Sequence, residues 1–115
     1  GDLVMAKTNF KKGDFISFFP GDQAGHEQKG RRPGLVVSNN LFNQNSSLIF
    51  VCPITNSSDG YPFHIPIPSG NKVKGVVMTE QLRALDFKAR RMTVLGSAPE
   101  ELTETVVAVI AQILK

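Results

Sequence analysis

The segment Leu48–Ile54 constrains the fold more than any other part of this 115-residue chain. It reads LIFVCPI, an uninterrupted apolar run with β-branched and aromatic members. A strand with one exposed face alternates apolar and polar residues, whereas a continuous apolar run suits a strand that is buried on both faces. The sequence therefore predicts that Leu48–Ile54 is the central strand of a sheet.

Shorter strands surround this segment and are separated by turn residues such as Pro20–Gly21. The predicted strands are Phe15–Phe19, Gly34–Ser38, Phe63–Ile67, Gly75–Thr79 and Met92–Leu95. In the strand over residues 63–67 the apolar side chains alternate, with proline at outward positions, which places this strand at a sheet edge. The Asn-rich segment Asn39–Ser47 predicts a turn or a short helical excursion.

The chain ends in one predicted helix, Glu100–Leu114. Its apolar residues fall on one stripe, formed by Leu102, Val106, Val109, Ile110, Ile113 and Leu114, which we expect to pack on the sheet. Ser97 and Glu100 match the spacing of a capping box. About six short strands and one terminal helix predict a mainly β fold, a partly open antiparallel barrel with a C-terminal α-helix. We expect a single domain over residues 1–115.

The charge of the chain favours a phosphate-rich or acidic partner. Residues 1–96 carry 12 Lys and Arg against 7 Asp and Glu, a net charge of +5, with clusters at residues 29–32 and 88–91. Clustered cations attract nucleic acid largely independently of its sequence, although short basic runs are also common on solvated surfaces. No apolar run approaches the ~18 residues of a membrane span, so we expect no membrane partner.

Cys52 is the only cysteine, which excludes a disulfide within the chain. It has no Cys or His at ligand spacing, so we expect neither a structural zinc site nor any other metal or cofactor. A lone thiol inside an apolar strand is most simply a small core residue. The composition fits a reducing cytoplasm.

One polar loop gathers residues that suit phosphodiester cleavage without a metal. His26, Glu27, Arg31 and Arg32 lie within seven residues of each other. Such cleavage needs a base for the ribose 2′-OH, an acid for the leaving oxygen and cations for the charged phosphorane. Arginine matches two phosphate oxygens with its fork of donors. The alternative is an ordinary ion pair between Glu27 and one of the two arginines.

Two further segments place polar residues at strand ends. Thr55 follows the buried run, where its hydroxyl could bind a phosphate oxygen or simply cap the turn that follows. Glu80–Arg83 follows the strand over residues 75–79, and its Gln81 suits a base edge, although a polar strand end with a surface arginine is an equal alternative. His64 is predicted to face outward on an edge strand and has no partner nearby in sequence, so we expect it at the surface.

Six segments in this order resemble the MazF/Kid (PemK-like) toxin family, from Gly13 to about Leu114. They are GDFISFFP from Gly13, GHEQKGRRPGLVVS from Gly25, VCPIT from Val51, GYPF from Gly60, GVVMTEQLRALDFKAR from Gly75 and APEEL from Ala98. The resemblance implies an SH3-like β-barrel with a C-terminal helix, in a homodimer. It further implies a toxin that cleaves single-stranded RNA without metal, leaves 2′,3′-cyclic phosphate and 5′-OH ends, and is inhibited by a cognate antitoxin.

The resemblance also carries residue roles. Arg32 would stabilise the phosphorane and protonate the leaving oxygen, and Thr55 would hold a phosphate oxygen. The base is open among Glu27, His26 and Glu80. Met78 stands where the Kid branch has an arginine and Glu80 where it has an aspartate, so the chain is closer to the MazF branch. The implied RNA groove is lined by Phe18, Gln28, Arg31, Gln81, Arg83, Lys88 and Arg90, with Phe18 or Phe19 stacking on a base.

Two other functions compete with the ribonuclease. A non-enzymatic toxin of the CcdB type shares the fold and poisons gyrase by binding. Such toxins lack the Arg–Thr pair and end in a tail that contains Trp, whereas this chain has Arg32, Thr55 and no Trp. A catalytically inactive homologue that only binds RNA or an antitoxin is the third possibility.

Overall fold

The computed structural model describes residues 10–21, 30–57 and 60–115. In this part, seven strands form one sheet in which every ladder is antiparallel. They are β1 (Asp14–Phe18), β2 (Arg32–Val36), β3 (Leu48–Thr55), β4 (His64–Pro66), β5 (Val76–Met78), β6 (Arg83–Asp86) and β7 (Thr93–Ser97). The helices are α1 (Asn40–Gln44), the 3-10 helix η3 (Thr79–Gln81) and α2 (Glu100–Leu114). The predicted mainly β fold with a C-terminal helix is confirmed, and the sheet stays open.

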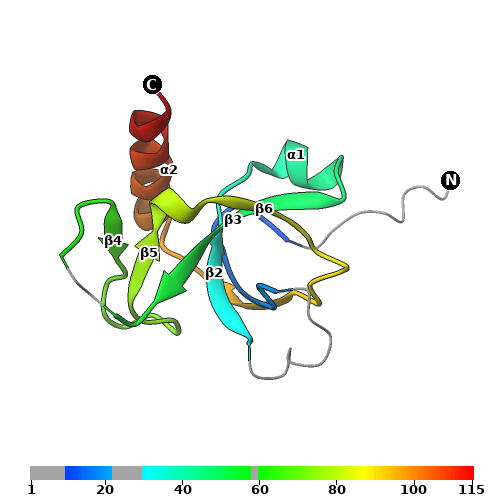
Figure 1. The fold of residues 1–115 in the computed structure, drawn as a ribbon, viewed down its shortest axis with the longest axis horizontal. Helices are drawn as coiled ribbons and strands as arrows, with labels where there is room; N and C mark the ends of the chain where they lie inside the picture. Colours follow the sequence, from blue (N-terminus) through cyan, green and yellow to red (C-terminus); the bar gives the residue numbers. More distant parts are fainter. Residues whose placement is uncertain (1–9, 22–29, 58–59) are drawn as a thin grey trace, which may run out of the picture.

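Strand β3 is the centre of this sheet, as Figure 1 shows. One edge of β3 pairs with β2, and its other edge pairs with β6 along the first half and with β5 near its end. Successive side chains of β3 enter two different apolar clusters: Ile49 and Val51 enter one, Cys52 and Ile54 the other. The prediction that this strand is buried on both faces is confirmed.

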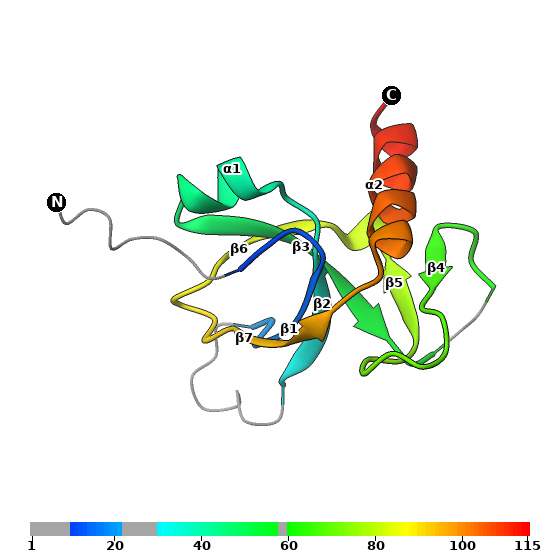
Figure 2. The ribbon, with the colours of Figure 1, turned by 180° about the vertical axis from the view of Figure 1, so that it is seen from behind.

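Helix α2 covers one of the two clusters, because Leu102 and Val106 pack beside the side chains of β3. It stands next to β4 and β5 in both views (Figures 1 and 2). The predicted stripe is correct at this end, but packing stops before Ile113 and Leu114, which are 41% and 74% exposed. Among the described residues, no helix has the length and apolar character that crossing a bilayer requires.

Three local predictions need correction. The capping box is wrong, because Ser97 belongs to β7 and the N-cap of α2 is Pro99, which forms no side-chain cap. Strand β6 was not predicted, since its polar ends mask its pairing with β3. The strand over residues 63–67 does lie at the sheet edge as β4, but Phe63, expected to face inward, is 37% exposed.

The end of β3 is held by a close backbone contact with Gly75. Gly75 has a φ of +119°, and a Cβ placed there would lie 2.2 Å from the carbonyl oxygen of Thr55. Only glycine combines this backbone conformation with so close an approach. The contact fixes the position of Thr55 relative to the loop that leads into β5.

We predict that Gly75→Ala lowers the free energy of unfolding by at least about 3 kcal/mol, because backbone strain and a steric clash add together. The matched control is Gly70→Ala. Gly70 has a φ of +93° but nothing within 4 Å of its added Cβ, so only strain of about 1–2 kcal/mol is expected. Urea unfolding followed by circular dichroism measures both. Equal losses in the two variants would contradict the contact with Thr55.

Candidate nucleic-acid site

An open depression of about 700 Å³ lies where β2 begins and β3 ends. The loop before β5 and the exposed side of β7 complete its walls. Its lining residues are Ser17, Arg31, Arg32, Pro33, Ile54, Thr55, Asn56, Ser57, Lys72, Val73, Lys74 and Leu95. The lining contains four cationic side chains and, among the described residues, no carboxylate. Such a depression suits an anionic ligand.

The register of β2 and β3 brings Arg32 and Thr55 together. Gly34 pairs with Pro53 and Val36 with Val51, so the same antiparallel register, extended by two residues, places Arg32 opposite Thr55. Opposite residues in an antiparallel pair share one face of the sheet, with Cβ atoms about 5 Å apart. Both residues line the depression, so the predicted pair lies in one site.

Both side chains of this pair have donors available. Arg32 is exposed and forms neither a hydrogen bond nor an ion pair with the described residues. The Thr55 hydroxyl oxygen accepts the backbone N–H of Ser57 at 3.2 Å, which is the turn cap that the sequence offered as an alternative. Because the oxygen accepts in this bond, its own hydrogen can still be donated. The guanidinium and the hydroxyl can therefore both donate to the same anion.

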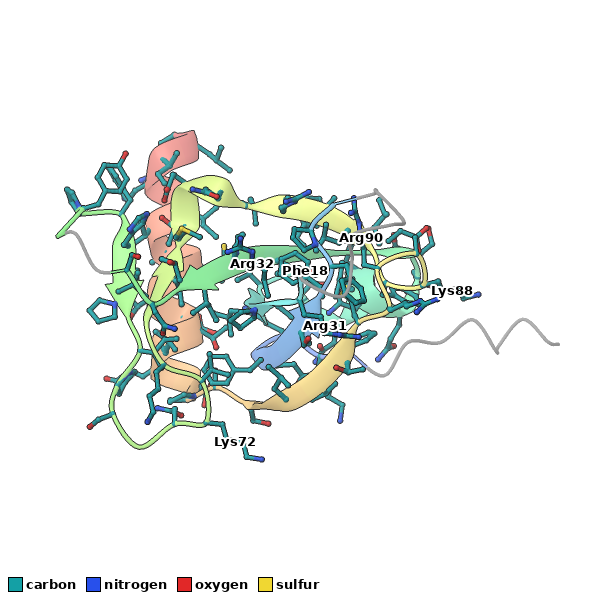
Figure 3. The ribbon with its side chains drawn as sticks, turned by 60° about the horizontal axis from the view of Figure 1, so that its bottom comes forward. Phe18, Arg31, Arg32, Lys72, Lys88 and Arg90 are labelled. Carbon is teal, nitrogen blue, oxygen red and sulfur yellow. The ribbon has the colours of Figure 1, made fainter. Side chains whose placement is uncertain are left out.

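Arg31, the neighbour of Arg32, is held by protein contacts. Its guanidinium donates to the hydroxyl of Ser17 and to the carbonyl of Arg91 at 2.9 Å, and it lies 4.5 Å from the centre of the Phe19 ring. Figure 3 shows Arg31 and Arg32 on the same face of the molecule. Arg31 therefore joins β1, β2 and the segment before β7, and at the same time adds positive charge to the depression.

Two other predicted RNA-binding arginines also donate to backbone. The guanidinium of Arg90 donates to the carbonyls of Pro20 and Gly21, both at 2.9 Å, and that of Arg83 to Pro20 at 3.3 Å. These bonds hold the segment that follows β1. Neither residue lines the depression, nor does exposed Lys88, so their predicted role in RNA binding stays a prediction.

Phe18 cannot stack on a base, and that prediction is wrong. Its side chain is fully buried in the cluster that contains Ile49 and Val51. Adjacent residues of a strand face opposite ways, so Phe19 is the half-buried one, and its ring already carries the guanidinium of Arg31. The side chain of Phe18 points inward because a phenylalanine favours the core.

The prediction that His64 lies at the surface is also wrong, although its partner is indeed not nearby in sequence. Its Nε2 lies 2.9 Å from Oε2 of Glu80, and its side chain is only 11% exposed. The partner is distant in sequence. The two residues meet because β4 pairs with β5, which places His64 opposite Met78, two residues before Glu80. Glu80 also accepts a weaker bond from Gln81 at 3.4 Å.

These contacts set the basicity of Glu80. Partial burial raises the pKa of its carboxyl, but the hydrogen bond and charge of His64, a backbone N–H and Gln81 together lower that pKa below its ordinary value. A lower pKa makes a carboxylate a weaker proton acceptor. Glu80 and Gln81 do not line the depression, so the structure does not bring Glu80 together with Arg32 and Thr55.

The remaining predicted residues, His26, Glu27 and Gln28, lie outside the described residues. Cys52 is buried, as predicted, and burial followed by the charge of Glu80 raises the pKa of its thiol to about 12. Such a thiol does not ionise near neutrality and cannot serve as a nucleophile. In the described ranges, no three His, Cys, Asp or Glu side chains form a cluster that could hold a metal ion.

Sequence reasoning missed Lys72 and Lys74, which line the depression from the loop before β5. The signal in the sequence is the alternation Lys-Val-Lys, in which one apolar residue between two charged ones indicates a buried anchor with exposed neighbours. Ser17 was missed as well, since nothing local distinguishes it from other strand hydroxyls.

The two adjacent arginines should differ in their effect on stability. We predict that Arg31→Ala lowers the free energy of unfolding by about 1 kcal/mol, because two hydrogen bonds and a cation–π contact are lost at an exposed position. Arg32→Ala, which removes no such contact, should stay within about 0.5 kcal/mol of the parent protein. Chemical unfolding measures both, and the reverse order would contradict the assigned contacts.

Comparison with known proteins identifies the family of this chain. Residues 11–114 match the family described as PemK-like, MazF-like toxin of type II toxin-antitoxin system. Endoribonuclease toxin MazF of Escherichia coli strain K12 is 38% identical over 79 residues, which cover 68% of this chain and 70% of that protein.

Solved structures agree in fold as well. The crystal structure of MazF from Deinococcus radiodurans gives a TM-score of 0.81 at 36% identity, over 91% of this chain and 96% of that chain. The crystal structure of MazE-MazF from the same bacterium gives 0.79 at 30% identity, over 91% and 94%. This chain therefore belongs to the PemK-like, MazF-like toxin family of type II toxin-antitoxin systems.

Proposed function

We propose that this chain is an endoribonuclease toxin that cleaves single-stranded RNA and that Arg32 and Thr55 hold the phosphate it cleaves. The observation that carries the proposal is the pairing of an uncommitted guanidinium with a hydroxyl in a cationic depression. Relatives at 38% and 34% identity are named endoribonuclease toxins, which fits this chemistry.

The reaction needs only groups that proteins supply. The ribose 2′-oxygen attacks phosphorus while a base takes its proton, the bond from phosphorus to the 5′-oxygen breaks, and that oxygen gains a proton. The products are a 2′,3′-cyclic phosphate and a 5′-OH. Arg32 stabilises the additional negative charge of the phosphorane with paired N–H donors, and Thr55 orients one phosphate oxygen. The positive charge of Arg32 does the work that a metal ion does in other nucleases, so we propose a metal-independent reaction.

The base in this proposal comes from the segment just before Arg32. Glu80, the other candidate, is bonded to His64 and does not line the depression. His26 and Glu27, six and five residues before Arg32 in the sequence, are the two remaining candidates. Either side chain has the chemistry of a general base near neutral pH.

The partners follow from the family. We propose a cognate antitoxin as the protein partner, because this is a type II toxin family and a similar crystal structure contains MazE with MazF. We propose that the single-stranded RNA substrate is messenger RNA and that the toxin therefore acts in the cytoplasm. We also propose a homodimer, since large apolar side chains are exposed on β7 and at the end of α2, among them Val94, Ile113 and Leu114.

The nuclease proposal predicts that the purified protein cleaves an unstructured RNA in EDTA. Arg32→Ala should lower the rate at least about 100-fold, because it removes the main donor to the phosphorane. Arg32→Lys should restore only part of the rate, since it keeps the charge without the fork. Thr55→Val should slow cleavage while Thr55→Ser, which keeps the hydroxyl, should not. Gel electrophoresis gives the rates, and direct kinase labelling identifies the 5′-OH ends.

Loss of cutting in EDTA, or normal cutting by Arg32→Ala, would overturn the mechanism. A gyrase cleavage assay run in parallel separates the CcdB-type alternative, which predicts gyrase–DNA complexes and intact RNA. RNA binding without turnover by the unmodified protein would instead identify an inactive homologue.

The dimer proposal predicts a mass of twice 12.5 kDa in solution. Burial of the exposed apolar side chains drives the association, so it should persist in high salt, unlike an association through charges. Multi-angle light scattering at micromolar protein, at low and high salt, measures this. The mass of a single chain under both conditions would contradict the proposal.

A further inference from the structure

We propose that Lys72 and Lys74 form a second phosphate subsite, which binds the RNA backbone beside the cleaved bond. This inference rests on the proposed nuclease function and adds the residues that hold the strand next to Arg32 and Thr55. The subsite recognises the backbone phosphates of single-stranded RNA and not its bases, because lysine acts on phosphate as a point charge.

The first support is the position of the two lysines. Both line the depression that contains Arg32 and Thr55. In Figure 3, Lys72 lies at the lower edge of the molecule, away from Arg32, so it is placed for a different phosphate. A depression of about 700 Å³ is in the range that encloses whole small molecules and is therefore larger than one phosphate group needs.

The second support is that the loop carrying the lysines is built and anchored. The backbone N–H of Ile67 donates to the carbonyl of Gly75 at 2.9 Å and closes the loop, and Asn71 bonds to the Pro68 carbonyl at 2.8 Å. Val73 is buried in the apolar cluster beneath α2. An anchored residue between two exposed lysines fixes the backbone from which both charges extend, so little backbone freedom is lost on binding.

Each lysine also lies next to a defined part of the fold. Lys74 precedes Gly75, whose backbone packs against the carbonyl of Thr55. The stem of Lys72 passes over β7, where its Cδ would lie 3.6 Å from a Cβ added to Gly96. The lysines thus extend the cationic surface from the reacting pair toward β7.

The third support is charge. Lys72 and Lys74 are exposed and form no ion pair with the residues that the structure describes, whereas Lys12 lies 3.5 Å from a carboxylate oxygen of Glu104. Four cations line the depression with no carboxylate among its described lining residues. Like charges repel one another, and a polyanion relieves that repulsion. An RNA strand, with one phosphate for each nucleotide, supplies charges at several points along the depression.

The test uses the double variant Lys72→Ala/Lys74→Ala and the control Lys11→Ala/Lys115→Ala, which removes the same charge outside the depression. RNA binding is followed by fluorescence anisotropy across salt concentrations. Loss of two phosphate contacts should reduce the salt slope by about 1.4, which corresponds to about tenfold weaker binding near 0.15 M salt. In cleavage assays KM should rise while kcat stays near that of the parent. The control variant should change neither quantity by more than about twofold.

Methylphosphonate substitution locates the contact. RNA that the parent protein cuts is made with one neutral methylphosphonate at each position flanking the cleaved bond. At one of these positions the substitution should weaken RNA binding by the parent protein. RNA binding by the double variant should not change there, because the lysine charge that faces that phosphate is already gone. Additive losses at every position, or a double variant equal to the control, would overturn the subsite.

The outcomes also separate the subsite from the nuclease proposal. A parent protein that binds RNA with the expected lysine dependence but does not cut it would overturn the nuclease function and keep the subsite. Cutting that does not depend on the two lysines would overturn the subsite and keep the nuclease function. A parent protein that neither binds nor cuts RNA would overturn both proposals.

Discussion

The pairing of β3 on both of its edges is the constraint on which the rest of the structure depends. Its register with β2, extended two residues beyond the Gly34–Pro53 pair, puts Arg32 opposite Thr55, and both residues line one depression. A shift of one residue would turn Arg32 or Thr55 to the other face, because side chains alternate along a strand. Burial of β3 in two apolar clusters makes that shift costly. The position of the site thus follows from core packing rather than from local interactions.

Six of the described cationic residues fall into two groups that the sequence does not distinguish. Arg31, Arg83 and Arg90 donate to backbone carbonyls or hydroxyls of distant segments, whereas Arg32 and the lysines of the loop before β5 keep their donors available. Arg31 and Arg32 are neighbours in one basic cluster, yet one organises the protein and the other is open to a ligand. The difference depends on hydrogen-bond acceptors far along the chain, whereas the composition gives only the charge.

Elements defined by their own residues could be predicted. The buried central strand, the edge position of β4 and the bounds of α2 follow from hydrophobic period and turn chemistry, and all are found in the structure. Predictions that depended on distant partners failed. Phe18 turned inward, His64 met Glu80 across two paired strands, and Ser97 was taken up by β7. The pair Arg32 and Thr55 entered through family resemblance, because no local signal links residues 23 positions apart.

The close approach of Gly75 to the Thr55 carbonyl keeps two properties of the site independent: the position of Thr55 and the charge of the loop before β5. It fixes the end of β3 from beneath, while the loop on the other side of Gly75 carries side chains that do not support the hydroxyl. Charges in that loop can change without displacing Thr55. Under the proposed function, descendants of such a chain can change how tightly an RNA strand is bound, and so which transcripts are cleaved first, without altering the proposed cleavage centre.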